Sequence, residues 1–213
     1  METVNLLKDY FQEIGEGEVE ITLFHFSEIK NIEETFLFPI EQAELALLKN
    51  QKRQREFCAI RCIRNRKNLP FPILYSAIGA PYFNEIPKKI SISHSKELAV
   101  FAISPFKVGV DVEPMTERII KIKDRFTTSS EIGLFNFNQI KTCTIIWTIK
   151  EVLYKLSGLK NVDFLKEMRI INLKNNQATC QFMTEYGQRH VKIKFHEMAN
   201  FIISFNPLSY YES

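Results

Sequence analysis

Two apolar segments in the middle of the chain constrain the fold most. Residues 98–104 read LAVFAIS and residues 108–112 read VGVDV, and both are rich in residues that favour strands. The short connection at 105–107 predicts a β-hairpin between them. Because side chains alternate along a strand, Asp111 and Glu113 are expected to point to the same side.

Similar patterns predict the other elements. Strands are expected at 18–26, 168–173, 178–183, 191–195 and 201–205, and helices at 3–14, 40–66 and 141–157. Gly158 is a natural stop for the last helix, and Asn175-Asn176 a hairpin turn. The prolines and glycines of residues 69–87 indicate loop and short strand, and residues 115–138 are expected to be mixed and largely helical. Each half then has strands and one long helix, which predicts an α+β protein of two similar α/β subdomains meeting near residues 105–110.

Composition excludes several classes of protein. The chain has 213 residues, 45% of them hydrophobic, and 28 basic against 25 acidic residues give a net charge of only +3. That balance does not indicate a nucleic-acid-binding protein, and no stretch is long and apolar enough to span a membrane. The acidic start is unlike a signal peptide, and four cysteines without paired metal spacing are expected to be reduced core thiols. A cytoplasmic protein is the expected result.

Three features indicate chemistry. Asp111 and Glu113, side by side, repel each other and call for a cation such as Mg²⁺ or a shared proton, although taken alone the pair favours solvated carboxylates at a strand end. Glu151 and Lys155 follow Trp147 at four-residue spacing on one helix face, where a simple surface ion pair is the alternative. His94, between Ser93 and Ser95, suits a phosphate contact or a loop histidine that bonds to the backbone.

Together these features resemble a known family. The order Gly79-x-Pro81, Ser93-His94-Ser95, Gly109-x-Asp111-x-Glu113 and Trp147-x-x-Lys150-Glu151-x-x-x-Lys155 is similar to that of the Sfp-type 4′-phosphopantetheinyl transferases, in the holo-acyl-carrier-protein synthase superfamily. Each motif is short, but their combination in this order is specific. The motifs run from about residue 79 to residue 160. One departure is Ala80, where the family often has lysine.

The resemblance implies an architecture and an activity. The architecture is a pseudo-dimer with its active site at the interface. Residues 1–17 would form an N-terminal extension, and residues 18–107 an N-terminal subdomain with a basic helix that binds coenzyme A. Residues 108–213 would form a C-terminal subdomain with the Mg²⁺-binding motifs. The activity is transfer of the 4′-phosphopantetheine arm of coenzyme A to a serine of an apo acyl, peptidyl or aryl carrier protein. Adenosine 3′,5′-bisphosphate leaves. A monomer is expected, with neither nucleic acid nor membrane as a partner.

The resemblance also assigns roles to residues. Asp111, Glu113 and Glu151 would hold Mg²⁺. Catalytic roles fall to Glu151, Lys155 and His94, with Glu151 as the favoured base and Glu131 in reserve. The coenzyme A contacts would be Lys52, Arg53, Arg61, Gly79, Pro81, Ser93, His94 and Lys155. Lys52, Arg53 and Arg61 are the candidates for its 3′-phosphate, with a solvated basic helix face as the alternative.

Two other functions are compatible with the same residues. One is an inactive relative that only binds coenzyme A or a carrier protein. The other is an unrelated Mg²⁺-dependent phosphohydrolase or nucleotide-binding protein, which would release phosphate without a carrier. A transfer assay separates the first from an active transferase, and phosphate release without carrier would identify the second.

Overall fold

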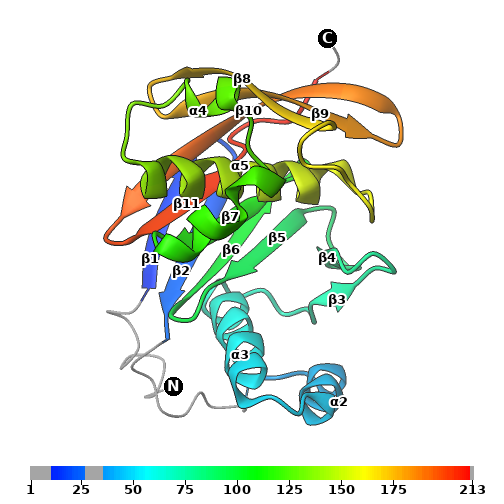
Figure 1. The fold of residues 1–213 in the computed structure, drawn as a ribbon. Coiled ribbons are helices and arrows are strands. Elements are labelled where there is room, and N and C mark those ends of the chain that lie inside the picture. Colours follow the sequence, from blue (N-terminus) through cyan, green and yellow to red (C-terminus); the bar gives the residue numbers. More distant parts are fainter. Residues whose placement is uncertain (1–10, 27–35, 212–213) are drawn as a thin grey trace.

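The structure is a computed structural model, which describes residues 11–26 and 36–211. Its strands form two antiparallel sheets (Figure 1). The first has the order β1-β2-β6-β5-β4-β3 and the second the order β7-β11-β10-β9-β8. The first sheet's strands are β1 (Phe11–Glu16), β2 (Val19–His25), β3 (Leu74–Tyr75), β4 (Pro81–Tyr82), β5 (Lys89–His94) and β6 (Leu98–Ser104). The second sheet's strands are β7 (Val110–Pro114), β8 (Met168–Lys174), β9 (Gln177–Thr184), β10 (Gly187–Met198) and β11 (Phe201–Phe205).

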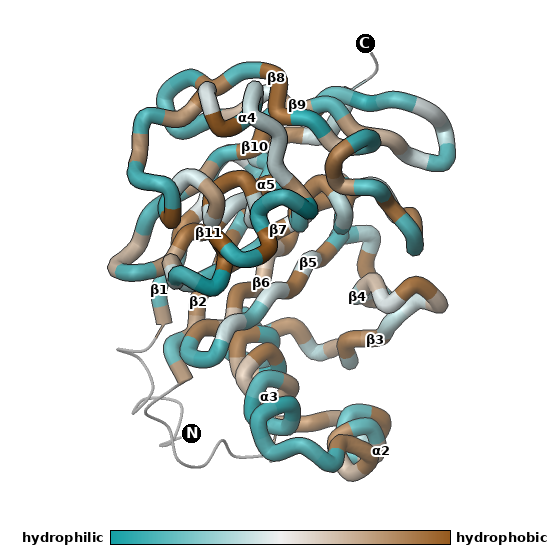
Figure 2. The backbone as a smooth tube through the Cα atoms, in the orientation of Figure 1, coloured by the Kyte–Doolittle hydropathy of each residue, from teal (hydrophilic) through white to brown (hydrophobic). Residues whose placement is uncertain are grey.

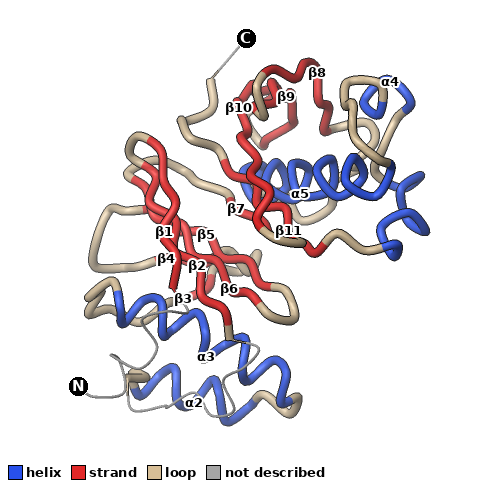
Figure 3. Tube along the Cα trace, turned by 90° about the vertical axis from the view of Figure 1, so that its left-hand side faces the viewer, coloured by secondary structure: helices blue, strands red, loops and turns tan. Residues whose placement is uncertain are grey.

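The helices cover the outer faces of the two sheets (Figure 3). Helix α3 (Gln51–Arg66) packs on the first sheet, and α2 (Pro39–Leu47) lies beside α3. Helix α5 (Gln139–Ser157) packs on the second sheet, with the 3-10 helix η2 (Glu117–Arg125) and the short α4 (Ser129–Ile132) nearby. No helix among the described residues is long and apolar enough to cross a bilayer.

One apolar cluster joins the inner faces of the sheets. It combines residues of β2 and β6 from the first sheet with residues of β7 and β11 from the second, among them Leu23, Val100, Val112 and Ile203. Figure 2 shows brown segments along these central strands, while much of α3 is teal. The layers therefore run from α3 through the two sheets to α5, and any site between the sheets lies next to this cluster.

The α+β class predicted from the sequence is confirmed, and so are most elements. The strand at 18–26, the helical 40–66 region, the helix at 141–157 and the four C-terminal strands are all present. Helix α5 begins at its cap Asn138, whose Oδ1 accepts a hydrogen bond from the Lys141 amide at 2.9 Å, and it ends at Gly158 with φ of 73°. In the 115–138 region η2 and α4 are present, as expected.

The predicted hairpin is wrong. Strand β6 pairs with β2 and β5, whereas β7 pairs with β11 of the other sheet. Residues 105–109 therefore carry the chain from one sheet to the other. Asn206, fully buried, fixes this crossover: its Oδ1 accepts from the Gly109 amide at 2.8 Å, and its Nδ2 donates to the Lys107 carbonyl at 3.0 Å.

The expected N-terminal helix is also wrong where the structure describes it. Residues 11–16 form β1, which pairs with β2, and the rest of the predicted 3–14 helix lies outside the described residues. A strand is favoured because Phe11 stacks on Phe24 at 4.4 Å across the pair. The whole of β1 falls in the stretch expected to be an extension, residues 1–17, yet it forms an edge of the first sheet. The predicted boundaries of the extension at residue 17 and of the N-terminal subdomain at residue 107 remain predictions. The similarity of the two subdomains also remains a prediction.

Gly109 lies so close to α5 that a methyl group does not fit. A Cβ at this position would lie 2.9 Å from the Val152 carbonyl oxygen and 3.0 Å from Val152 Cγ1. We expect Gly109→Ala to lower the free energy of unfolding by about 1–3 kcal/mol, because the crossover or α5 must shift. Urea denaturation measures this loss.

Gly133→Ala is the matched control. Gly133 has φ of −64°, and the nearest atom to an added Cβ is 3.5 Å away. This substitution should leave the stability unchanged or raise it by up to about 1 kcal/mol. Equal losses for the two variants would show that contact with α5 is not what requires glycine at position 109.

Candidate functional site

A cleft of about 520 Å³ lies between the two halves of the fold. Helix α3, the β3–β4 region and the end of β5 form one side, and β7 and α5 form the other. Of the residues predicted from the sequence, the cleft is lined by Arg53, Arg61, Gly79, Pro81, Ser93, His94, Asp111, Glu113 and Lys155. A second cleft of about 470 Å³ adjoins it and shares Gly79, Pro81 and Lys155. The structure thus brings together residues that are up to 100 positions apart.

Asp111 is deeply enclosed in the cleft, with 5% of its surface exposed. Its Oδ1 accepts hydrogen bonds from Ser93 Oγ at 2.7 Å and from Lys155 Nζ at 2.8 Å. Its Oδ2 is buried and has no hydrogen-bond partner among the described residues. A buried carboxylate oxygen without a partner is costly, so this atom is suited to a ligand.

Glu113 and Glu151 are held beside this buried charge. Burial and then the negative charge of Asp111 raise the pKa of Glu113, although Trp147 Nε1 donates to its Oε1 at 3.3 Å. Burial, followed by the charges of Asp111 and Glu113, raises the pKa of Glu151 to about 7, against the opposing effect of Lys155. Two carboxylates with raised pKa values beside Asp111 favour a cation or a proton among them.

The chemical type of these groups, carboxylate oxygens, suits a hard cation. Carboxylate oxygens are what Mg²⁺ prefers, and Asp111 Oδ2 is a free ligand atom. In the described part of the chain, however, no group of three or more His, Cys, Asp or Glu is arranged so that it could hold a metal ion. The predicted metal site is therefore a set of suitable donors close together, not a formed centre.

Lys155 and Ser93 were both expected to contact coenzyme A, and both are engaged inside the protein. Lys155 Nζ donates to the Val110 carbonyl at 2.7 Å as well as to Asp111. Ser93, only 8% exposed, donates to Asp111 and accepts from the Val112 amide at 3.3 Å. Lys155 also lines both clefts, so its ammonium group is accessible to a ligand. Ser93 instead holds Asp111 in place.

Two serines of β5 join the sheets at the site. Ser91 Oγ accepts a hydrogen bond from the Val110 amide at 3.0 Å, two residues from the bond between Ser93 and the Val112 amide. We expect Ser91→Ala to lower the free energy of unfolding by about 1–3 kcal/mol, because it leaves a buried amide without an acceptor. Chemical denaturation measures the loss. The exposed Ser209→Ala is the control and should change little; equal stability of the two variants would contradict a joining role for Ser91.

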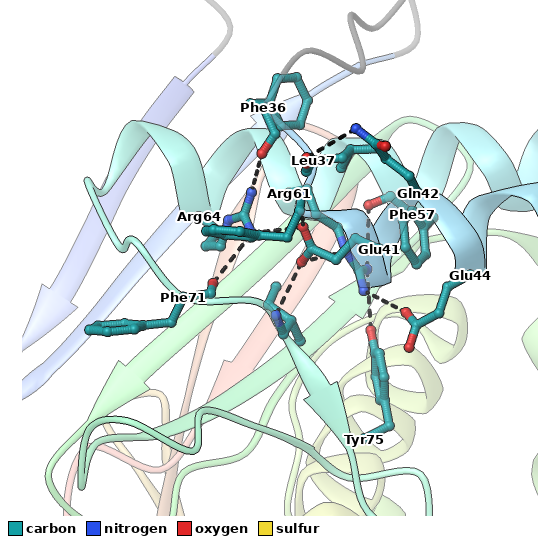
Figure 4. A network of polar contacts seen from close by, with 12 residues as sticks. Phe36, Leu37, Glu41, Gln42, Glu44, Phe57, Arg61, Arg64, Phe71 and Tyr75 are labelled. Atoms are coloured by element: carbon teal, nitrogen blue, oxygen red, sulfur yellow. Dashed lines mark hydrogen bonds and ion pairs between the residues drawn. The ribbon is translucent and has the colours of Figure 1, made fainter.

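The basic residues of α3 have different environments. Arg53 lines the cleft, and the exposed Lys52 forms an ion pair with Glu56 at 3.2 Å. Arg61 is only 1% exposed and is neutralised by Glu41 at 3.4 Å and Glu44 at 3.6 Å (Figure 4). Its guanidinium also lies over the Phe57 ring, 3.4 Å from the centroid. Arg61 is thus a structural cation at the wall of the cleft, and Lys52 and Arg53 remain the better candidates for an anion.

Glu131, the reserve base, is in the wrong place for that role. It is 3% exposed and forms an ion pair with Lys150 at 2.9 Å. It also accepts hydrogen bonds from the Ile170 amide at 3.0 Å and from the amide and hydroxyl of its own helix cap, Thr128, at 3.0 and 3.1 Å. The contacts with Lys150 and Ile170 tie α4 to α5 and β8. Glu131 is therefore a buried structural carboxylate, and Glu151 is the remaining candidate base.

His94 ends β5 at the mouth of the cleft, so it is a strand residue rather than a loop residue. Its Nδ1 lies 3.6 Å from Glu56 Oε2. The sequence interpretation overlooked Glu56, although it is the single acid in the basic helix 51–66. That isolated charge is the signal that would have identified it.

Comparisons with known proteins agree with the motifs. Residues 107–205 match the family model of the 4′-phosphopantetheinyl transferase superfamily (ACPS). A stretch of 84 residues is 36% identical to the 4′-phosphopantetheinyl transferase gsp of Aneurinibacillus migulanus. That alignment covers 38% of this chain and 35% of the relative, so the chain spans about a third of the relative's length.

The matched region contains one wall of the cleft. It includes Asp111, Glu113, Glu151 and Lys155, whereas α3 and His94 lie before it. The resemblance inferred from the short motifs is confirmed for this region. Residues 107–205 of the chain are therefore similar to the 4′-phosphopantetheinyl transferase superfamily.

Proposed function

We propose that this protein transfers the 4′-phosphopantetheine arm of coenzyme A to a serine of an apo carrier protein. The observation that carries the proposal is the cleft itself. Its second-sheet wall carries the carboxylates Asp111 and Glu113 with Lys155, and the facing wall carries Arg53 and His94. Such a cleft offers cationic groups to the phosphates of coenzyme A and acidic groups to a metal ion.

Each group has a role in the reaction. Lys155 and His94 contact the pyrophosphate, and Lys52 and Arg53 the 3′-phosphate. When bound by Asp111, Glu113 and Glu151, Mg²⁺ would neutralise and align the pyrophosphate. The serine oxygen of the carrier forms a bond to the β-phosphorus, and the bond from that phosphorus to the bridging oxygen breaks. Adenosine 3′,5′-bisphosphate leaves with the bond electrons.

Glu151 is the proposed base for the serine proton. A base works best when its pKa is near the working pH, and burial among carboxylates brings the pKa of Glu151 to about 7. The same residue would also be one of the ligands of Mg²⁺. Asp111 and Lys155 are less suited as bases, because they are already hydrogen-bonded to each other.

The partners follow from the same chemistry. Carrier proteins are commonly acidic, and a chain with a net charge of +3 would be steered towards them. Because residues from both sheets line the cleft, one chain is expected to suffice as a monomer. The four cysteines are buried and none is in a disulfide, in keeping with a cytoplasmic protein.

The test compares coenzyme A turnover with and without a carrier. With Mg²⁺ and an apo carrier protein, we expect release of adenosine 3′,5′-bisphosphate in equal amount to modified carrier. Release should be absent without the carrier, and absent with a carrier whose target serine is replaced by alanine. Binding of coenzyme A without release with any carrier would indicate the inactive relative. Phosphate release without a carrier would instead indicate a phosphohydrolase.

A further inference from the structure

Glu56 is the third acid that lines the cleft, and it lies on the side that carries the basic residues. It lies on α3 among basic residues, is 5% exposed and lines the same cleft as Arg53 and His94. A buried carboxylate is costly and repels phosphates. Its contacts must therefore explain its position.

Glu56 lies between two cationic side chains. Its Oε1 is 3.2 Å from Lys52 Nζ, one helical turn earlier, and its Oε2 is 3.6 Å from His94 Nδ1. The contact to His94 is the one that crosses from α3 to β5. Because Nδ1 faces Glu56, the other ring nitrogen, Nε2, is the one left for a ligand.

The charges around His94 oppose one another. Burial lowers the pKa of His94, the negative charge of Glu56 raises it, and the ammonium groups of Lys155 and Lys52 lower it. Arg53, Arg61, Asp111 and Glu113 line the same cleft and complete the charged surroundings. In the free protein the imidazole is thus disposed to be neutral, with one carboxylate favouring its protonation.

We propose that Glu56 is a positioning residue for His94: it orients the imidazole through Nδ1 and enables it to take up a proton when an anionic substrate binds. The proposal rests on the proposed function only for the identity of that substrate, a pyrophosphate ester such as coenzyme A. A carboxylate that orients a histidine and stabilises its charged form is a general device of active sites. The repulsion between Glu56 and the phosphates is then offset by a stronger contact from protonated His94.

The first test needs no ligand. NMR titration of the His94 ring in the free protein gives its midpoint pH, and His94→Asn identifies its signal among four histidines. We expect Glu56→Gln to lower the midpoint by about 1 pH unit, because a negative charge at close range is lost. Glu56→Asp should shift it less. Lys52→Gln is the matched control and should shift the midpoint upwards, because it removes a cation that disfavours protonation.

The second test measures binding of coenzyme A as a function of pH by calorimetry. In wild-type protein, measurements in buffers of different ionisation enthalpy should show proton uptake near pH 7. Glu56→Gln should weaken binding roughly tenfold at and above pH 7, which corresponds to one charge-assisted contact. At low pH, where His94 is protonated in both proteins, the variant should bind as well as wild type or better. In the His94→Asn background, Glu56→Gln should lose this pH-dependent effect.

The outcomes are separable. An unchanged His94 midpoint in Glu56→Gln, or a loss of affinity that is the same at every pH, would overturn the positioning role and leave Glu56 as a structural residue. Absence of coenzyme A binding by wild-type protein would count against the proposed function instead. The ligand-free titration still decides the coupling of Glu56 to His94 in that case.

Discussion

Replacement of Glu41 by glutamine is expected to lower the free energy of unfolding by about 3–5 kcal/mol, because it leaves the buried Arg64 without its carboxylate partner and leaves Arg61 with only the more exposed Glu44. Glu41 is fully buried on α2, and Arg61 and Arg64 are each 1% exposed. Glu41 Oε2 accepts from Arg64 Nη1 at 2.7 Å, and Oε1 lies 3.4 Å from Arg61 Nε. The carboxylate also accepts hydrogen bonds from the backbone amides of Phe38 and Ile73, both at 3.1 Å.

Glu44→Gln is the matched control. Glu44 pairs with the same Arg61 at 3.6 Å, but its side chain is 38% exposed. Exposed ion pairs contribute little, so a loss below about 1 kcal/mol is expected. Urea denaturation at neutral pH measures both variants. Equal losses, or a loss below about 1 kcal/mol for Glu41→Gln, would show that the buried network does not stabilise α2 against α3.

Replacement of Asp111 by asparagine is expected to reduce phosphopantetheinyl transfer at least about 100-fold while the fold is kept. Asparagine fills the same space and its carbonyl still accepts from Ser93 or Lys155. It lacks the negative charge that would hold a cation and keep Lys155 beside the phosphates. The loss should appear as a lower kcat in a Mg²⁺-dependent transfer assay, with the circular dichroism spectrum unchanged.

Glu197→Gln is the control for Asp111→Asn. Glu197 also forms an ion pair with a lysine, Lys141, at 2.6 Å. Its side chain, however, is 44% exposed and lies outside both clefts. Its loss should leave transfer unchanged. An Asp111→Asn variant with near wild-type activity would contradict the assignment of the acidic wall.

Local patterns in the sequence predicted most elements but not how they meet. The strand at 98–104 and the helix ending at Gly158 depend on nearby residues, so both were predicted correctly. The hairpin was not, because a short connection fits a turn within one sheet and a crossover between two equally well. Strand β1 was predicted as helix because its pairing with β2, through Phe11 and Phe24, is a tertiary contact.

The site was predicted in part for the same reason. The motifs gave the residues of the acidic wall, and spacing along β7 placed Asp111 and Glu113 together. Arg61 is a structural cation because it pairs with Glu41. Arg64 pairs with the same carboxylate, which lies 23 positions earlier in the sequence. No local pattern shows that α2 folds back onto α3. Glu56 was overlooked because it lies on helix α3, whereas its partner His94 lies on strand β5, 38 positions later in the sequence.

The intact mass of an apo carrier protein, after incubation with coenzyme A, Mg²⁺ and the purified protein, tests the central claim most directly. A panel of acyl and peptidyl carriers covers the partner classes, and the Asp111→Asn variant serves as the negative control. The account predicts that at least one carrier gains the mass of one phosphopantetheine arm at its serine, and that the variant adds it far more slowly. No gain on any carrier, or an equal gain with Asp111→Asn, would contradict it.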